Sequence, residues 1–212
     1  MIEVDNYRNI FADISPTDIP DIVHIHEGGG QATVNDFYLE DSGTLFHFFP
    51  DVETKKTSNL WTRKCIYKSD ADGIILFEKG TRKHIVICEL KSGSNKFDLA
   101  FDQATGCLVK IIMMLSVCDH FQLNDFDVTF IFAVKIDDEM LNDIIQLEEA
   151  AVAPKQELFN QLCKHHFCRI IHLDAYSPRH SVHRDILQKD VKVRIARLNS
   201  DQTSVKIDCG ML

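Results

Sequence analysis

The feature that most constrains the fold is a change of hydrophobic period between residues 72 and 135. Two short runs, DGIILF (72–77) and HIVICEL (84–90), are apolar at almost every position, and EKGTR supplies a turn between them. The following segment has helical spacing, and DVTFIFAVK (127–135) returns to a strand-like run. Strands on both sides of an amphipathic helix predict an α/β fold, with a central mixed sheet covered by helices on at least one face. The expected helix begins near Asn95, a plausible N-cap, and its apolar stripe contains Phe97, Phe101, Ala104, Leu108, Ile111, Ile112 and Leu115.

Weaker patterns on either side of this region predict further elements. Before it we expect a short helix over 6–14, a strand over 21–30 that runs into a glycine turn, a hairpin within 37–49 around Asp41-Ser42-Gly43, and a strand over 63–67. After it we expect helices over 139–151 and 154–166, the second beginning at Pro154, and a strand over 168–176. Period-two runs at 191–198 and 204–209 predict a C-terminal β-hairpin through residues 199–202.

Composition limits the class of protein. The chain has 212 residues, of which 45% are hydrophobic and 26% charged, as expected for one globular domain. No apolar run reaches the roughly 18 residues of a membrane span, and MIEVDNYRNIFADI lacks the basic and apolar segments of a secretory signal. The seven cysteines form no CxxC pair and are scattered, which favours a reducing, cytoplasmic location over a disulfide framework.

Two charged residues at the end of a buried strand point to chemistry. Glu89 and Lys91 share one face of the strand that begins at residue 84, because side chains two positions apart point the same way. Asp72 stands at the start of the preceding strand, which in an antiparallel hairpin lies beside the end of the next. A partly buried carboxylate costs roughly several kcal/mol unless a cation meets it. Two converging carboxylates would hold Mg²⁺ or Mn²⁺, and the lysine would orient a water molecule or stabilise developing charge, which suits metal-assisted phosphodiester hydrolysis.

At these residues the chain resembles the PD-(D/E)XK nuclease superfamily, which includes restriction endonucleases, RecB-type exonucleases and resolvases. The resemblance covers about residues 62–135: Asp72 in SDADGIIL, Glu89-Leu90-Lys91 in ICELKSG, and the helix that follows. It implies a restriction-endonuclease-like αβββαβ core over about 62–176, with 1–61 and 177–212 as elaborations of a single domain. It also implies a nuclease in which Asp72 and Glu89 bind the metal.

The same resemblance implies a further site residue and shows two departures. Many family members carry a glutamine in the helix, and Gln103 matches its position. The resemblance therefore gives Asp72, Glu89, Lys91 and Gln103 catalytic roles. Ala71 replaces the family's proline, and Cys107 stands where RecB-type members have a tyrosine.

Several assignments stay open at this point. Asp70 shares a face with Asp72 and is an alternative ligand, and either Glu40 or Glu53 is a candidate for an additional upstream acidic residue. His24 and His26 have a spacing that zinc sites use, but no matching ligand follows closely, so we expect exposed strand histidines. Residues 163–168, CKHHFC, crowd zinc-type ligands at a helix end, where the two cysteines are expected to pack inward.

Charge bears on the partners. The formal net charge of −9 opposes binding to nucleic acid. Basic residues nevertheless gather locally, and screening limits the reach of distant acidic groups to about 8–10 Å. We therefore expect a nuclease with nucleic acid, DNA more than RNA, as substrate, no membrane, and either a homodimer or a partner subunit, as in a bacterial or phage defence system. The alternative is a catalytically silent scaffold subunit that keeps the fold. The basic residues are Arg63, Lys64, Lys68, Lys79, Arg82, Lys83, Arg179, Arg184, Lys189, Lys192, Arg194 and Arg197.

Overall fold

The computed structural model describes residues 16–27, 34–50, 71–91, 96–116, 121–146, 153–176 and 188–212. These ranges contain eight strands in one sheet and three α-helices. The strands are β1 (Thr17–His26), β2 (Asp36–Pro50), β3 (Gly73–Lys79), β4 (Arg82–Lys91), β5 (Phe126–Lys135), β6 (Cys168–His172), β7 (Asp190–Leu198) and β8 (Ser204–Asp208). The helices are α3 (Phe97–Leu115), α4 (Asp138–Gln146) and α5 (Pro154–Lys164). The expected α/β class with a mixed sheet is confirmed.

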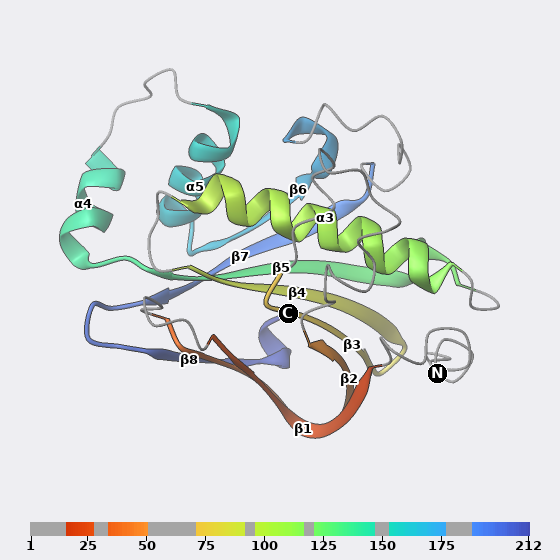
Figure 1. Cartoon of the computed structure of the whole chain (residues 1–212). Coiled ribbons are helices and arrows are strands. Elements are labelled where there is room, and N and C mark those ends of the chain that lie inside the picture. The colour runs from red at the N-terminus through yellow and green to blue at the C-terminus, as the bar shows by residue number, and fades with distance from the viewer. Residues whose placement is uncertain are drawn as a thin grey trace.

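The sheet has the order β1-β2-β3-β4-β5-β7-β6, and β8 pairs with β2. Strands β1 to β4 are antiparallel neighbours, whereas β5 runs parallel to both β4 and β7. The helices lie above the central strands, and β1, β2 and β8 lie beneath them (Figure 1). The sheet therefore curls, and its central strands have a covered face on each side.

The upper core lies between the sheet and the helices. Every residue of the predicted α3 stripe is buried, and the helix packs against alternate residues of the central strands. Phe97, near the start of α3, has its ring centroid 5.0 Å from that of Phe132 on β5 and 5.1 Å from that of Phe159 on α5. Aromatic contacts therefore join the helical layer to the sheet.

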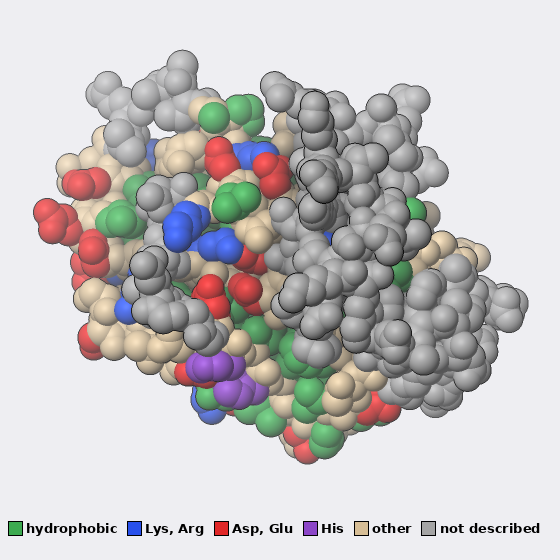
Figure 2. Space-filling model, viewed as in Figure 1, with side chains coloured by type: hydrophobic (Ala, Val, Ile, Leu, Met, Phe, Trp, Pro, Cys, Tyr) green, Lys and Arg blue, Asp and Glu red, His purple; other side chains and the backbone are tan. Residues whose placement is uncertain are grey.

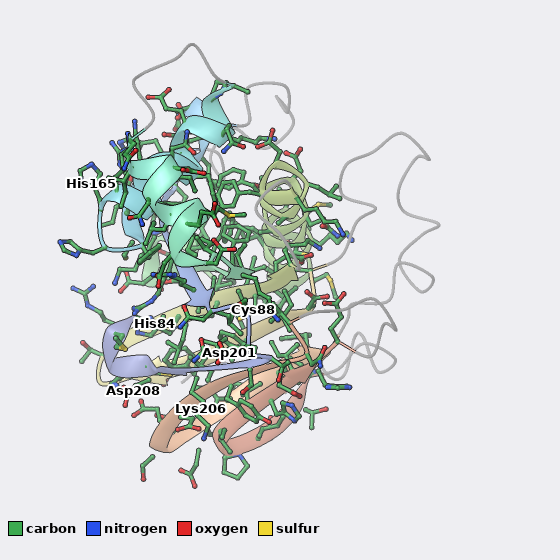
Figure 3. All side chains as sticks on the ribbon, turned by 90° about the vertical axis from the view of Figure 1, so that its left-hand side faces the viewer. His84, Cys88, His165, Asp201, Lys206 and Asp208 are labelled. Atoms are coloured by element: carbon green, nitrogen blue, oxygen red, sulfur yellow. The ribbon has the colours of Figure 1, made fainter. Side chains whose placement is uncertain are left out.

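The lower core explains why the central strands are apolar at almost every position. Val86, Cys88 and Leu90 of β4 point away from α3 and pack with side chains of the lower strands, among them Phe37 and Ile207. In Figure 3, Cys88 lies between the helical layer, where His165 is found, and the lower strands, which carry Lys206. A strand that is buried on both faces has no polar face to show in its sequence.

The hairpin of β3 and β4 forms as predicted. Lys79 pairs with Arg82, so only Gly80 and Thr81 make the turn. Gly80 has φ +62°, and glycine at the first central position is typical of a tight hairpin turn. Helix α3 begins at Phe97, close to the start predicted near Asn95, and its N-cap is Lys96, which makes no side-chain capping hydrogen bond.

The hairpin predicted within 37–49 is wrong. Strand β2 runs without interruption from Asp36 to Pro50 and pairs with β1 over residues 36–40 and 45–48. The turn-forming residues instead make a bulge, since Pro20 pairs with Leu45 and Ile22 with Glu40. Gly43 has φ +82°, Asp21 has φ +60°, and the Gly43 N–H donates to Asp21 Oδ1 at 2.6 Å. The same residue types serve a turn and a bulge because both need left-handed backbone.

The predicted C-terminal hairpin is also wrong, although both of its strands exist. A tight turn is present, in which the Gln202 N–H donates to the Asn199 carbonyl at 3.1 Å. Beyond the turn the strands separate: β7 enters the sheet between β5 and β6, and β8 pairs in parallel with residues 36–40 of β2. Each strand gains a long-range partner in place of its sequence neighbour.

Most of the other predicted elements are present. The strand expected over 21–30 is β1, the helices expected over 139–151 and 154–166 are α4 and α5, and Pro154 occupies the first turn of α5. The helix predicted over 6–14 and the strand over 63–67 lie outside the described residues. The five cysteines in the described part of the chain are free thiols, and no helix there is long and apolar enough to cross a membrane.

Candidate functional site

Asp72 and Glu89 are neighbours at one end of the β3–β4 hairpin. Gly73 pairs with Cys88, so the next positions along the two antiparallel strands are Asp72 and Glu89. The backbone N–H of Leu90 donates to Asp72 Oδ2 at 2.6 Å. This bond fixes the Asp72 carboxylate against β4, beside Glu89.

Glu89 is the most unusual ionisable group of the site. Its side chain is 1% exposed, and its carboxylate forms an ion pair with the Lys91 ammonium. Burial and, to a smaller extent, the negative charge of Asp72 together raise the pKa of Glu89 from 4.5 to about 8. Lys91 acts in the opposite direction but does not offset these two effects. Below about pH 8 the Glu89 carboxyl therefore tends to hold a proton, because ionising it would place a second negative charge beside Asp72.

Lys91 and Glu89 project to the same side of the sheet. The ion pair requires this, and the burial pattern agrees, because Ile85 and Ile87 lie in the upper core beneath the helices. Lys91 is the more accessible member, with a side chain that is 15% exposed. The sequence-based assignment of faces on this strand is therefore confirmed.

Helix α3 connects to the site through Cys107. The Ala71 N–H donates to Cys107 Sγ at 2.9 Å, which ties the start of β3 to the helix. Gln103 lies one helical turn earlier, on the side of α3 that Cys107 shares, because residues four apart are neighbours on a helix. Its side chain is half-buried, and its Oε1 is shielded from solvent. Its catalytic role stays a prediction.

The three alternative acidic residues have different outcomes. Asp70 and Glu53 lie outside the described residues. Glu40 is not brought to the pair, because Pro50 is the residue of β2 that pairs with Gly73, and Glu40 lies ten positions away along the same strand. There Glu40 binds Lys206 of β8 at 2.8 Å. The structure therefore does not bring Glu40, one of the two candidates, to the carboxylate pair.

Five of the predicted basic residues have polar partners within the described part of the chain. Lys79 binds Asp41 at 3.1 Å, and Arg82 binds Asp127 at 2.8 Å. In the tail, Lys192 and Arg194 donate to the carbonyls of Leu212 and Met211, and Arg197 pairs with Asp138. Figure 2 shows Lys and Arg side chains gathered beside acidic ones near the middle of the visible face. Lys79, Arg82 and Arg197 are therefore paired with carboxylates, whereas Lys192 and Arg194 donate to backbone oxygens and keep their positive charge. Arg63, Lys64, Lys68, Arg179 and Arg184 lie outside the described ranges.

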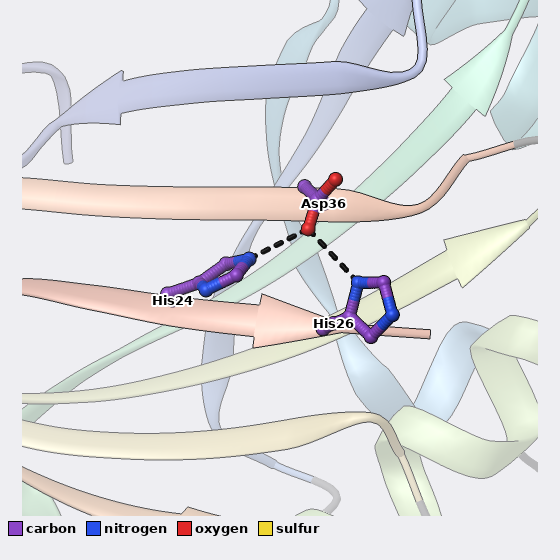
Figure 4. A group of neighbouring side chains, drawn as sticks. All are labelled: His24, His26 and Asp36. Carbon is purple, nitrogen blue, oxygen red and sulfur yellow. Dashed lines mark hydrogen bonds and ion pairs between the residues drawn. The ribbon is translucent and has the colours of Figure 1, made fainter. Parts of the chain in front are cut away.

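A second group of ionisable side chains lies on the lower strands. Among the described residues, His24, His26 and Asp36 are the one set of three whose ligand atoms converge, all within 4.8 Å of one another (Figure 4). Sequence reasoning recognised the histidine pair but missed Asp36. Only the pairing of β1 with β2 identifies Asp36, because it sets this residue opposite His26. CKHHFC forms no such group. Cys163 is buried, as predicted, and desolvation raises its pKa to about 12, whereas Cys168, also predicted to pack inward, is only half-buried.

No family model, curated protein sequence or solved structure matches this chain.

Proposed function

We propose that this protein is a divalent-metal-dependent nuclease, more active on DNA than on RNA, whose site is Asp72, Glu89 and Lys91. One observation carries the proposal: the buried Glu89 carboxyl lies beside a second carboxylate, Asp72, and pairs with the Lys91 ammonium at the same strand end. Burial and like charge keep the pKa of Glu89 near 8, so a further cation would stabilise the ionised pair.

The donor set fits a hard cation. Carboxylate oxygens are the ligands that Mg²⁺ and Mn²⁺ prefer, and Asp72 and Glu89 would supply them. The bound ion would supply Lewis-acid activation of a phosphodiester and of a water molecule. The chain's own groups do the rest: the Leu90 N–H orients Asp72, and Lys91, the more exposed partner, places a positive charge where a phosphate would approach.

The order of the elements supports the same proposal. Strands β2, β3 and β4 are consecutive antiparallel neighbours, then α3 crosses the sheet, and β5 lies parallel to β4. This succession agrees with the last five elements of the expected αβββαβ core. The carboxylates fall at the start of the second strand and the end of the third, as the resemblance requires.

The charge distribution favours a recognition partner. Three of the described cations, Lys79, Arg82 and Arg197, are paired with carboxylates, and the net charge of −9 repels a polyanion. We propose that a partner subunit or a second copy supplies much of the affinity for nucleic acid, as in a defence complex.

One observation favours the second candidate, a silent scaffold. The Lys91–Glu89 ion pair already gives the buried carboxylate a partner, and such a pair can be purely structural. In that case the site would bind no metal and cleave nothing.

Metal binding and cleavage, measured together, separate the two. We expect Asp72→Ala and Glu89→Ala each to abolish Mn²⁺-dependent cleavage of single- and double-stranded DNA and RNA, and to remove thermal stabilisation by Mn²⁺. Lys91→Ala should retain most metal binding yet lose activity by about 100-fold or more, because an ammonium is no ligand but stabilises developing charge. The matched control is Lys83→Ala, on the same strand but at its other end. A parent protein that neither binds Mn²⁺ nor cleaves any substrate would establish the scaffold instead.

A further inference from the structure

The strand pair β1–β2 carries a set of side chains that the nuclease site does not use. His24 and His26 alternate with the buried residues Val23 and Ile25, so both imidazoles stand on the outer face of β1. Asp36 begins β2 directly opposite His26. His24 lies on the diagonal from it, a distance that side chains of neighbouring strands can bridge.

The three side chains converge on one point (Figure 4). His24 Nε2 lies 2.6 Å and His26 Nδ1 lies 2.9 Å from the same oxygen, Asp36 Oδ1. Donor atoms on one tetrahedral Zn²⁺ are about 3.3 Å apart, given Zn–N and Zn–O bonds of about 2.0–2.1 Å. The two contacts would therefore have to lengthen by about 0.4–0.7 Å to admit an ion.

The surroundings hold these side chains in place. The Tyr38 ring stacks on His24 with a centroid separation of 4.5 Å and an interplanar angle of 7°. The Lys206 ammonium lies 5.4 Å from the Tyr38 ring centroid and forms an ion pair with Glu40. The backbone N–H of Asp36 donates to the Thr203 carbonyl at 3.2 Å. Ligands that are already positioned lose little conformational entropy on binding.

We propose that His24, His26 and Asp36 form a binding site for a transition-metal ion of the Zn²⁺ type, separate from the carboxylate site. Two imidazoles and one carboxylate suit Zn²⁺, Co²⁺ or Ni²⁺, whereas Mg²⁺ and Ca²⁺ prefer oxygen alone. Three protein ligands leave a fourth position open. The side chains of His24 and His26 are 46% and 59% exposed, so that position faces solvent and is accessible to a water molecule or an anionic ligand.

Co²⁺ and Zn²⁺ test this site on the intact chain. We expect the parent to bind one equivalent of Co²⁺ that gives a tetrahedral-type visible absorption band, which one equivalent of Zn²⁺ displaces and excess Mg²⁺ does not. His24→Ala, His26→Ala and Asp36→Asn should each remove the band and weaken Zn²⁺ binding by about tenfold or more in calorimetry. The matched control is His172→Ala, which removes an exposed histidine bonded to the single carboxylate of Asp190 at 2.5 Å.

The outcomes are distinct from those for the nuclease. The double variant Asp72→Asn, Glu89→Gln should keep the Co²⁺ band, whatever happens to cleavage. A parent without the band, or a band that survives in all three ligand variants, would overturn the proposal. Circular dichroism on each variant excludes unfolding as the cause of a lost band, and because all three ligands lie at the surface, at least one variant is expected to keep the parent spectrum.

Discussion

Glu89 makes the stability of the protein depend on pH in an unusual direction. Its pKa in the folded state is about 8, above the ordinary 4.5, because the side chain is buried beside Asp72. Between these values the folded state holds a proton that the unfolded state has lost. The stabilisation is therefore complete below about pH 4.5 and is lost as the pH rises through 8.

We expect the unfolding free energy to fall with pH at a slope that depends on Glu89. Relative to Glu89→Gln, the parent should lose about 1.4 kcal/mol of unfolding free energy per pH unit between pH 5.5 and 7.5. Urea unfolding in EDTA at three pH values measures it, and subtraction of the two proteins cancels the other titrating groups. The control is Glu139→Gln in the first turn of α4, an exposed position, which should run parallel to the parent. If the unfolding free energies of the parent and of Glu89→Gln changed in parallel with pH, Lys91 would be keeping the Glu89 carboxylate ionised. The ion pair would then have a structural role.

At the scale of the elements, the bulge in β2 depends on left-handed backbone. Gly43 has φ +82° and open space around its Cα, so a methyl group there would meet no neighbour. The cost of Gly43→Ala is therefore conformational, about 1–2 kcal/mol for an L-residue in this region. Gly43→Asn should cost less, because asparagine tolerates this conformation. Thermal or urea unfolding measures both. Equal losses for the two variants would mean that the bulge has relaxed or that the cost comes from contacts.

The elements also show what could be predicted from sequence. Strands β3, β4 and β5 and helix α3 were predicted because each has its own apolar period, and Asp72, Glu89 and Lys91 follow from the strand ends. Pairing between distant strands has no such local signal. Asp41-Ser42-Gly43 has the residue types of a turn, and only the partner strand makes it a bulge.

The same reason explains the missed ligand and the wrong hairpin. Asp36 joins His24 and His26 through the register of two strands, which no spacing in the sequence encodes. The runs at 191–198 and 204–209 are strands, as their period predicted, but their partners are β5, β6 and β2. Pairing with β5 or β2 replaces the local hairpin, because in these pairings the apolar side chains of β7 and β8 are also buried in a core.

At the scale of the whole molecule, β8 completes the lower core. Ile207 and Cys209 are buried there, and residues 36–40 of β2 gain a parallel partner. Ile207→Ala should therefore cost about 2–4 kcal/mol in urea unfolding, as buried large-to-small changes do. Val205→Ala, at a half-exposed position on the same strand, is the matched control and should cost less. A small effect of Ile207→Ala would mean that β8 is only loosely attached and that the lower core is closed without it.

The pairing of β8 with β2 has a consequence for biosynthesis. Lys206 and Glu40, which form an ion pair across these strands, are 166 residues apart in the chain. A ribosome releases the chain from its N-terminal end at about 5–20 residues per second, so β2 waits roughly ten seconds or more for its partner. During that interval one edge of β2 and the apolar side chains of the lower layer are exposed to other nascent chains. This is the period in which a chaperone would have the most to protect.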